Sequence, residues 1–356
     1  MNINDVLSSK SIGLAIREDK SNLIPYLGEG FFPRDKKASI DIQWLAEQNG
    51  VPMSLAPSNF DSLATIRSRA GIELNKQEMA LFRESMLVSE RDTIDIQRAN
   101  ASDDAFLQDA LKNIFADAIN LKKGADVVAE RMRMQLLFPT GNAPAIYISA
   151  KGTTYAYNYD GNGEWANNNR TDLSGNATWD NPTTATPLDD INEIVENANE
   201  PIAYIGMAQE TMNKFIACEQ VQKAILSSNP NGVPYVTVGL AKELIKALFP
   251  TIVEVIVYKK TFKDENGVTH QFVPNGKVAF LPSGELGKTW YGMTAEEIRL
   301  VGNPKADIEI VDGVAVVFSQ KVDEPPYTST TTVSELLLPS FPRMMSCYLL
   351  NAYTPN

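Results

Sequence analysis

The chain has 356 residues, of which 44% are apolar and 21% charged, a composition typical of globular proteins rather than disordered or fibrous ones. Its length exceeds that of most single domains and predicts two or more substructures. No apolar run approaches the roughly 18–20 residues of a membrane span. The first 20 residues lack the apolar core of a secretion signal, and the two cysteines, Cys218 and Cys347, are too few for a disulfide framework or a cysteine-rich zinc site. We therefore expect a protein that resides in the reducing interior of a cell.

The formal charge of −12 comes from 32 basic and 44 acidic side chains and is spread unevenly. Residues 1–143 carry 17 Lys and Arg against 20 Asp and Glu, whereas residues 144–356 carry 15 against 24. Binding to nucleic acid without sequence preference needs clustered cations that displace counterions from phosphates, and no such cluster is present. Direct nucleic-acid readout is therefore disfavoured. The net negative charge is compatible with a surface that repels nucleic acid.

Candidate catalytic residues are few. His270 is the single histidine, which excludes histidine-rich metal sites. It follows the dipeptide Asn266-Gly267, a β-hairpin turn signal, so we expect a surface residue of a hairpin rather than a general base. Cys218 lies at the end of an apolar-periodic segment, where a buried thiol is expected. We expect no catalytic, cofactor-binding or metal-binding residues.

The segment 278–289 imitates a phosphate-binding loop, because a short apolar run leads into Gly287-Lys288-Thr289. The first glycine of that motif would fall at Pro282, which has no N–H and a fixed φ. The residues that follow, Trp290-Tyr291-Gly292, do not favour the helix whose N-terminus would hold the phosphate. Nucleotide binding at Gly284–Thr289 is therefore a minor alternative.

At the N-terminal end, a short helix is predicted near residues 5–17, within an arm that runs to about residue 35. Beyond it, Ile40, Ile42 and Trp44 alternate with polar residues, which predicts a strand. A second alternating run places Ile66 and Ile72 on one face, with Arg67 and Arg69 on the other. Segment 36–75 is therefore predicted as a long two-stranded ribbon. An isolated hairpin is marginal in water, so its apolar side chains need a partner, either the chain's own core or a neighbouring subunit. The candidate assembly-interface residues are Ile40, Ile42, Trp44, Ile66, Arg67, Arg69 and Ile72.

Residues 76–91 are predicted to be helical, because Met79, Phe82 and Met86 recur at helical spacing. The strongest helix follows at 102–137, with Ser102 as its cap and apolar residues at alternating spacings of three and four. It is the only helix of this length in the pattern, so a self-contained bundle is disfavoured. A coiled-coil dimer is one alternative, and a helix lying across a sheet is the better one.

The second half predicts alternating strands and helices. Short strands at 145–148 and 154–157 precede a surface stretch rich in asparagine and threonine at 162–181. The elements expected after it are helix 188–199, strand 202–207, helix 209–225, strand 235–238, helix 240–248 and strand 252–258. The tail predicts a hairpin around Asp312-Gly313 and further strands at 333–338 and 344–350.

This order suggests five segments. They are an N-terminal arm (1–35), an extended loop with its following helix (36–100), a first part of a peripheral domain with a long spine helix (101–187), an inserted axial α/β domain (188–302) and a second part of the peripheral domain (303–356). The C-terminal strands need a core, and the long helix offers an apolar stripe, so 101–187 and 303–356 are expected to form one discontinuous domain.

The same order of elements resembles the major capsid protein of tailed bacteriophages, and local sequence resembles the lambda-type branch, the phage major capsid protein E family. The segments that carry the resemblance are Phe31-Phe32-Pro33, Leu55-Ala56-Pro57, Trp179-Asp180, Pro187-Leu188-Asp189-Asp190-Ile191, Asp264-Glu265-Asn266-Gly267, Phe272-Val273-Pro274-Asn275-Gly276, Leu281-Pro282 and Gly287-Lys288-Thr289-Trp290-Tyr291-Gly292. The Asn-rich stretch matches no motif of the family.

The resemblance implies an α+β, Hong Kong 97-like phage capsid fold and a protein that is not an enzyme and has no cofactor. It implies self-assembly into hexamers and pentamers of an icosahedral head shell around packaged double-stranded DNA, without sequence-specific binding and without a membrane. A scaffolding protein, a portal and a decoration protein are the partners it implies. The expected location is the virion, after assembly in the bacterial host cytoplasm. Lys36, Lys37 and Lys76 are available for the lysine–asparagine crosslink of some relatives, but the sequence gives no sign of one. A tail or connector subunit that forms dimers or rings is the remaining alternative.

Overall fold

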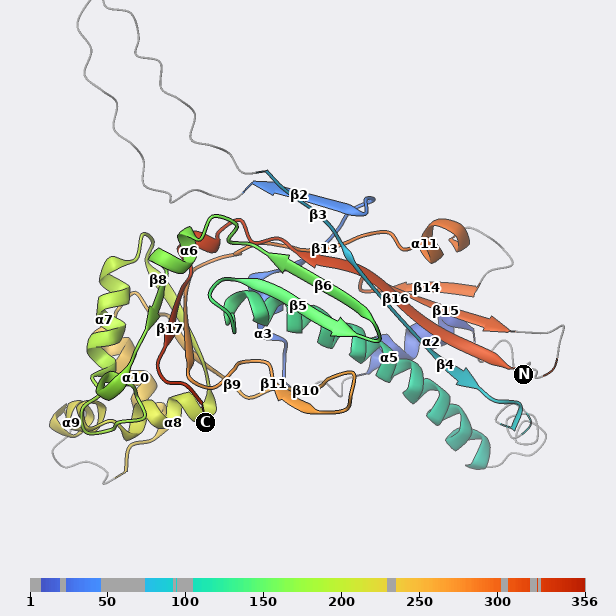
Figure 1. Cartoon of the computed structure of the whole chain (residues 1–356). Helices are drawn as coiled ribbons and strands as arrows, with labels where there is room; N and C mark the ends of the chain where they lie inside the picture. The colour runs from blue at the N-terminus through green and yellow to red at the C-terminus, as the bar shows by residue number, and fades with distance from the viewer. Residues whose placement is uncertain are drawn as a thin grey trace, which may run out of the picture. The chain divides into compact units, whose positions relative to one another are not determined.

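The computed structural model describes residues 8–19, 24–45, 74–91, 94, 105–228, 235–301, 307–320, 325 and 328–355 (Figure 1). They divide into two compact units. The first unit takes its residues from 1–42, 76–132 and 288–340, and the second takes them from 43–75, 133–287 and 341–356. Each unit is therefore assembled from segments that are distant in the sequence.

The first unit is built on a six-stranded sheet in the order β1-β13-β16-β15-β14, with β4 paired to β16. β1 runs parallel to β13, and the other pairs are antiparallel. Its helices are α2 (Ser9–Glu18), α3 (Leu27–Phe31), α5 (Ala105–Leu137, of which 105–132 belong to this unit) and α11 (Ala295–Leu300). Its strands are β1 (Arg34–Lys36), β4 (Ala80–Val88), β13 (Thr289–Tyr291), β14 (Asp307–Val311), β15 (Val314–Gln320) and β16 (Ser329–Pro339).

The core of the first unit lies between one face of this sheet and the helices α2 and α5. Ile12 and Ile16 of α2 and Ala118, Leu121 and Ala125 of α5 pack against apolar residues of the sheet. The sheet contributes Val88, Val311, Val314, Val316, Phe318 and Val333 to this cluster. The long helix therefore lies across a sheet, as expected from its single apolar stripe.

The second unit contains a five-stranded sheet in the order β7-β17-β12-β8-β9. Its larger helices are α7 (Pro187–Asn197), α8 (Gln209–Ala217), α9 (Glu219–Ser228) and α10 (Val238–Leu248), and short helical turns lie at α6 (Glu164–Asn168), η1 (Gly175–Ala177) and η2 (Met344–Ser346). Its strands are β5 (Ala145–Ala150), β6 (Thr153–Asn158), β7 (Arg170–Asp172), β8 (Ile202–Ala208), β9 (Glu254–Tyr258), β10 (Thr261–Lys263), β11 (Thr269–Gln271), β12 (Lys277–Pro282) and β17 (Tyr348–Asn351). Strands β5–β6 and β10–β11 form separate two-stranded hairpins.

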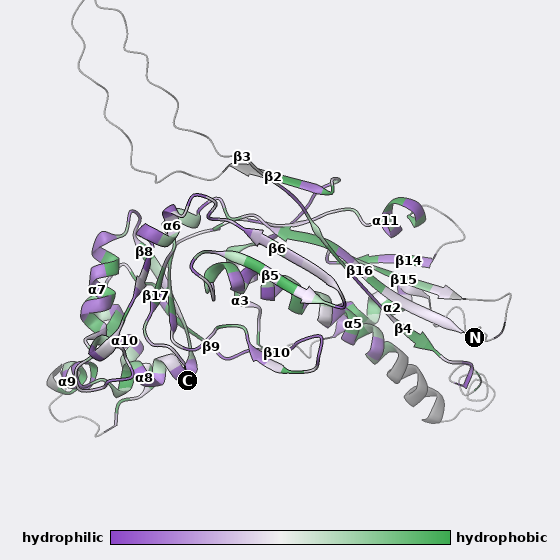
Figure 2. Cartoon of the chain, viewed as in Figure 1, coloured by the Kyte–Doolittle hydropathy of each residue, from purple (hydrophilic) through white to green (hydrophobic). Residues whose placement is uncertain are grey.

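One large apolar cluster joins the four helices of the second unit to its sheet. Trp179 and Phe215 are fully buried at its centre, with ring centroids 5.4 Å apart, and the strands contribute Ile205, Phe280 and Leu350. Hydrophilic and hydrophobic residues alternate along α7, whose buried residues include Ile191 and Ile194 (Figure 2).

Several sequence-based predictions are confirmed within a residue or two. The hairpin at Asp312-Gly313 joins β14 to β15 through that two-residue turn, and β2 (Asp41–Leu45) pairs with β3 (Leu74–Glu78) as the start and end of the expected ribbon. The rest of the ribbon and the predicted cap Ser102 lie outside the described residues.

Other predictions are wrong. Segment 80–88 is a strand rather than a helix, because all nine of its residues pair with β16 and this long-range pairing outweighs its helical spacing. The helix expected at 209–225 is divided at Cys218, where the amide of Glu219 bonds the carbonyl of Pro182. No strand forms at 235–238, because Thr237 caps α10 instead.

Segment 303–356 was expected to form one domain with the long helix; strands β14, β15 and β16 lie in the unit that holds residues 105–132 of α5, whereas β17 does not. Strand β17 pairs with β12 and β7, so it belongs to the sheet of the second unit together with residues of the predicted axial domain. Strand β13, expected within that axial domain, belongs instead to the sheet of the first unit.

Candidate assembly surfaces

The ribbon begins and ends at two ion pairs on the short helix α11. Thr294 caps this helix with its hydroxyl, and the next turn carries Glu296 and Glu297 side by side. Lys36, at the start of the ribbon, contacts the buried Glu297 at 2.7 Å, and Arg83, just beyond its end, contacts Glu296 at 2.5 Å. Two adjacent carboxylates therefore hold both legs of the ribbon at its base.

Of the candidate interface residues, Ile40, which directly precedes β2, is exposed over 56% of its surface. Ile42 is only 1% exposed, so its own chain already covers it, and this differs from the expectation that it is buried between subunits. Trp44 lies in β2, and its side chain is outside the described part of the structure. Ile66, Arg67, Arg69 and Ile72 lie outside the described residues. Ile40 remains as the described apolar residue of the ribbon that a neighbouring subunit could cover.

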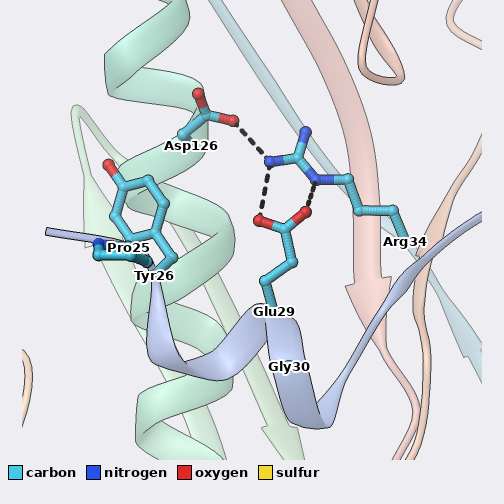
Figure 3. Close-up of a pocket in the computed structure, with 6 residues that line it drawn as sticks. All are labelled: Pro25, Tyr26, Glu29, Gly30, Arg34 and Asp126. Carbon is cyan, nitrogen blue, oxygen red and sulfur yellow. Dashed lines mark hydrogen bonds and ion pairs between the residues drawn. The ribbon is translucent and has the colours of Figure 1, made fainter. Parts of the chain in front are cut away.

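A charged network joins the end of the N-terminal arm to α5 within the first unit (Figure 3). Arg34 donates from Nε to Glu29 at 2.9 Å and from Nη2 to Asp126 at 3.2 Å, and Lys122 contacts the same Asp126 oxygen at 2.6 Å. The buried Glu130 accepts from the amide of Gly28 at 3.0 Å. Sequence analysis did not identify this network, because its members come from α3, β1 and α5 and meet only in the folded chain.

The network shifts the pKa values of its members. Burial alone would lower the pKa of Arg34, but the neighbouring Tyr291, Asp126 and Glu29 raise it above its usual value. Burial raises the pKa of Tyr26, and the charges of Asp126 and Glu130 raise it further. Tyr26 and Arg34 line an open depression of about 530 Å³. Because Arg34 and Lys122 are already paired with Glu29 and Asp126, the arrangement fits a structural junction rather than a reaction centre.

The imitation of a phosphate-binding loop also has a structural explanation. Lys288 contacts Asp35 of β1 at 2.7 Å, and the hydroxyl of Thr289 donates to the carbonyl of Phe32. The hydrogen bond from Lys288 lowers the pKa of Asp35. Thr289 opens strand β13 rather than a helix. The Gly-Lys-Thr segment therefore attaches the arm to the sheet.

The remaining chemical candidates are structural. His270 lies on the exposed β11, with Nε2 at 2.9 Å from Asp264, and this contact lowers the pKa of Asp264. Cys218 and Cys347 are both buried, and burial raises the pKa of each thiol, that of Cys218 to about 11. Within the described ranges, no three His, Cys, Asp or Glu side chains gather as metal ligands would. Among the same residues, no helix is long and apolar enough to cross a membrane.

The Asn-rich stretch clamps the C-terminal segment of the second unit. Trp165 donates from Nε1 to the carbonyl of Cys347 at 2.9 Å, and Asn169 donates to the carbonyls of Met345 and Cys347 at 2.7 and 3.0 Å. Further along, the amide of Trp179 donates to the carbonyl of Ala352. The polar side chains that characterise this stretch therefore satisfy backbone groups around β17.

Comparison with known proteins identifies the family. Residues 8–311 match the sequence model of the phage major capsid protein E family. The chain belongs to that family. A search of curated proteins found no match. As a phage major capsid protein, the chain is the subunit of a capsid shell, a structural role.

Solved structures share the fold. A protein assigned as the capsid protein of a prophage of Escherichia coli CFT073 has a TM-score of 0.59 at 13% identity, with 97% of this chain and 99% of that one covered. A phage-related protein from Bordetella bronchiseptica RB50 has a TM-score of 0.56 at 13% identity, with coverage of 98% and 99%. The capsid protein of cyanophage A-1(L) has a TM-score of 0.50 at 13% identity, with coverage of 95% and 96%. The capsid protein described here therefore has the expected phage capsid fold of mixed helices and strands, with strongly divergent sequence.

Proposed function

We propose that this capsid protein forms hexamers and pentamers that close into the icosahedral head shell of a tailed double-stranded DNA phage or prophage. The observation that carries the proposal is the family match over residues 8–311, which includes residues of both compact units. The shell encloses DNA without reading its sequence, consistent with a net charge of −12. A scaffolding protein, a portal and a decoration protein are its proposed partners, and it is proposed to assemble in the host cytoplasm without a membrane partner.

The proposed subunit carries no catalytic function. Gly287-Lys288-Thr289 is the segment that most resembles a nucleotide-binding motif. Its Lys288 side chain is paired with Asp35, and its Thr289 hydroxyl donates to the carbonyl of Phe32. A nucleotide-binding role for Gly284–Thr289 would require both contacts to break. Calorimetry with ATP separates the two cases, because binding heat that Lys288→Ala abolishes would replace the structural explanation with a catalytic or regulatory one.

Electron microscopy of the purified chain at high concentration tests shell formation directly. Closed particles, or rings of five and six subunits that convert to particles when a scaffold is added, are the expected result. A monomer that persists at all concentrations with and without scaffold would contradict it, and open tubes or rings of another order would favour a tail or connector subunit.

The ribbon is proposed to contact a neighbouring subunit, with Ile40 as the described apolar contact and Trp44, Ile66, Arg67, Arg69 and Ile72 as further candidates. Ile40→Ser should leave the circular dichroism of the monomer unchanged, because an exposed isoleucine contributes little to the stability of the free chain. It should lower the stability of assembled particles, because the proposed apolar contact with the neighbouring subunit is lost. Leu14→Ser, which removes another half-exposed apolar side chain from α2, is the matched control. Equal particle stability for the two variants would exclude Ile40 from the interface.

A further inference from the structure

The hairpin β5–β6 has an open edge. It forms a two-stranded sheet that no other strand of the described residues extends. Its turn, Lys151-Gly152, has both φ angles positive, as the tight two-residue turn of a hairpin requires. The amide of Gln135 bonds both the N–H and the C=O of Tyr147, so these groups of β5 face away from β6. Gln135 thereby covers the middle of the β5 edge.

The register fixes which groups of β6 face outward. Tyr147 stands opposite Ala156, and outward-facing residues of an antiparallel pair stand opposite one another. The N–H and C=O groups of Thr154, Ala156 and Asn158 therefore point away from β5. All three residues are exposed, and among the described residues no hydrogen bond reaches these backbone groups. Three donors and three acceptors thus line an edge that nothing in this chain's described part extends.

This edge also lacks the usual protection against pairing. Charged side chains on outer strands discourage contact with other sheets. The outer strands of the two larger sheets all carry them: β1, β4, β14, β7 and β9 each have at least one Asp, Glu, Lys or Arg. Strand β6, with the sequence Thr-Thr-Tyr-Ala-Tyr-Asn, has none, and Figure 2 shows it pale beside the more hydrophobic β5.

We propose that β6 pairs antiparallel with β6 of a second copy of this chain across a two-fold axis that passes beside Ala156. The proposal rests on the shell function, since a closed shell needs contacts between subunits of neighbouring rings. The edge is self-complementary: Ala156 meets Ala156 of the partner subunit, and Thr154 meets the partner's Asn158. The outward groups of the two strands then form six hydrogen bonds, and the hairpins join into one four-stranded sheet.

The side chains suit this symmetric pairing. Small alanines meet at the axis, so no bulk or like charge is brought together. On the opposite face, Tyr155 and Tyr157 already lie with parallel rings 6.3 Å apart, and the register sets Tyr155 against the partner's Tyr157. The exposed Lys151 at the turn falls beside the loop that follows the partner's β6, and this loop leads into α6, whose first residue, Glu164, is exposed. Aromatic rows and opposite charges across strands stabilise pairing.

Crosslinking tests the pairing in assembled particles. Hydrogen-bonded antiparallel residues have Cα atoms about 5.5 Å apart, so Ala156→Cys should give a covalent dimer on oxidation or with a short dimaleimide. The matched control is Tyr147→Cys, at a residue of β5 that is also exposed and stands opposite Ala156. Its symmetry copy would lie about 15 Å away, three strand spacings across the sheet, so no dimer is expected. Particles in which Ala156→Cys stays monomeric on a non-reducing gel would overturn the pairing but leave the shell function intact, whereas wild type that forms no particle overturns both.

Hydrogen exchange of the wild-type protein gives a test that needs no variant. Assembly should slow exchange of the amides of Thr154, Ala156 and Asn158 at least tenfold, because each gains an acceptor. The amide of Ser149, which faces outward on the opposite edge of the hairpin, should keep its rate. Unchanged rates at the three β6 amides in particles would overturn the proposal even if Ala156→Cys failed to assemble.

Discussion

The two units differ in the size of the apolar cluster around which each is built and in the ion pairs that surround it. In the second unit, aromatic and aliphatic side chains of four helices and a sheet form one large dry cluster around Trp179 and Phe215. In the first unit, the apolar cluster of α2, α5 and the sheet is smaller, and ion pairs attach the segments around it. These pairs are Arg17–Glu309, Lys123–Asp19, Arg34–Glu29, Arg34–Asp126, Lys36–Glu297, Arg83–Glu296 and Lys288–Asp35.

The difference matters for a shell subunit. Salt does not screen apolar burial, whereas exposed ion pairs contribute about 0.2–1 kcal/mol each and weaken as salt rises. The N-terminal arm is attached by partly buried pairs at Arg34, and Lys36 and Arg83, which flank the ribbon, are paired with carboxylates of α11. The attachment of the N-terminal arm in the first unit is therefore expected to weaken with salt more than the apolar cluster of the second unit does.

The largest expected effect concerns the apolar cluster. Trp179→Ala removes a fully buried side chain that packs on Phe215 and donates from Nε1 to Asp190 at 2.9 Å. The cavity and the lost contacts should lower the free energy of unfolding by about 3–5 kcal/mol. Chemical denaturation measures the loss of stability, and hydrogen exchange should show reduced protection in β8, β12 and β17. Tyr235→Ala, at a residue 73% exposed, should change stability by less than about 0.5 kcal/mol, and equal losses for both variants would refute the importance of the cluster.

A second test uses two glycines of the second unit with the same backbone conformation. Gly276 and Gly267 have φ angles of +80° and +79°. A Cβ at Gly276 would collide with the carbonyl oxygen of Tyr353, whereas nothing lies within 4 Å of one at Gly267. Gly267→Ala should cost about 1–2 kcal/mol for its positive φ, and Gly276→Ala should cost about 1–3 kcal/mol more, because the C-terminal segment must move. Similar denaturation midpoints for the two variants would show that this segment yields easily.

The sequence predicted local structure where local chemistry decides it. Asp312-Gly313 determines a two-residue turn whatever surrounds it, and the stripe of α5 requires one apolar face. Segment 80–88 was predicted wrongly, because Met79, Phe82 and Met86 fit a helix and only the distant β16 makes it a strand. The membership of β17 in the second sheet depends on pairing with β12 and β7, which no local pattern reveals.

The candidate surfaces divide in the same way. The ribbon was predicted from alternation at Ile40 and Ile42, but the burial of Ile42 depends on neighbours that the pattern does not name. The sequence placed Lys288 in an apparent phosphate-binding motif, whereas its partner in the structure is Asp35, more than 250 residues away in the sequence. The clamp by Asn169 had no sequence signal beyond the two tryptophans, Trp165 and Trp179, that flank it. Side-chain partnerships between distant segments are decided by the fold.

A third prediction concerns the charged network of the first unit. Arg34→Met keeps much of the side-chain volume but removes the hydrogen bonds to Glu29 and Asp126. Stability should fall by about 1–3 kcal/mol, because hydrogen bonds to charged groups are lost in a partly buried place. The loss should shrink in 1 M salt, where wild-type pairing is screened. Arg299→Met, on the exposed part of α11, is the control, and a loss independent of salt would show that Arg34 acts through packing alone.

The smallest effect concerns pH and two carboxyl groups of the second unit with opposite shifts. Glu200 accepts hydrogen bonds from Ser346 and Arg343, which lower its pKa. A lowered folded-state pKa gives stability that is present above the ordinary value of 4.5 and lost as pH falls through the folded value, so Glu200→Gln should be less stable than wild type at pH 7 and match it in strong acid. Burial raises the pKa of Asp190, with a hydrogen bond from Trp179 opposing it and the charges of Asp189 and Glu193 adding to it.

For Asp190 the sign is reversed. The folded chain binds its proton more tightly than the unfolded chain, so the carboxylate costs stability at pH 7, and this cost disappears as pH falls through the raised pKa. Asp190→Asn keeps an acceptor for Trp179 and should be as stable as wild type or more so at pH 7, with the advantage vanishing in acid. Unfolding midpoints from pH 3 to 7 measure both variants. If Asp190→Asn were less stable at every pH, the ionised carboxylate would be a favourable partner of Trp179, and the second unit would depend on charge as the first one does.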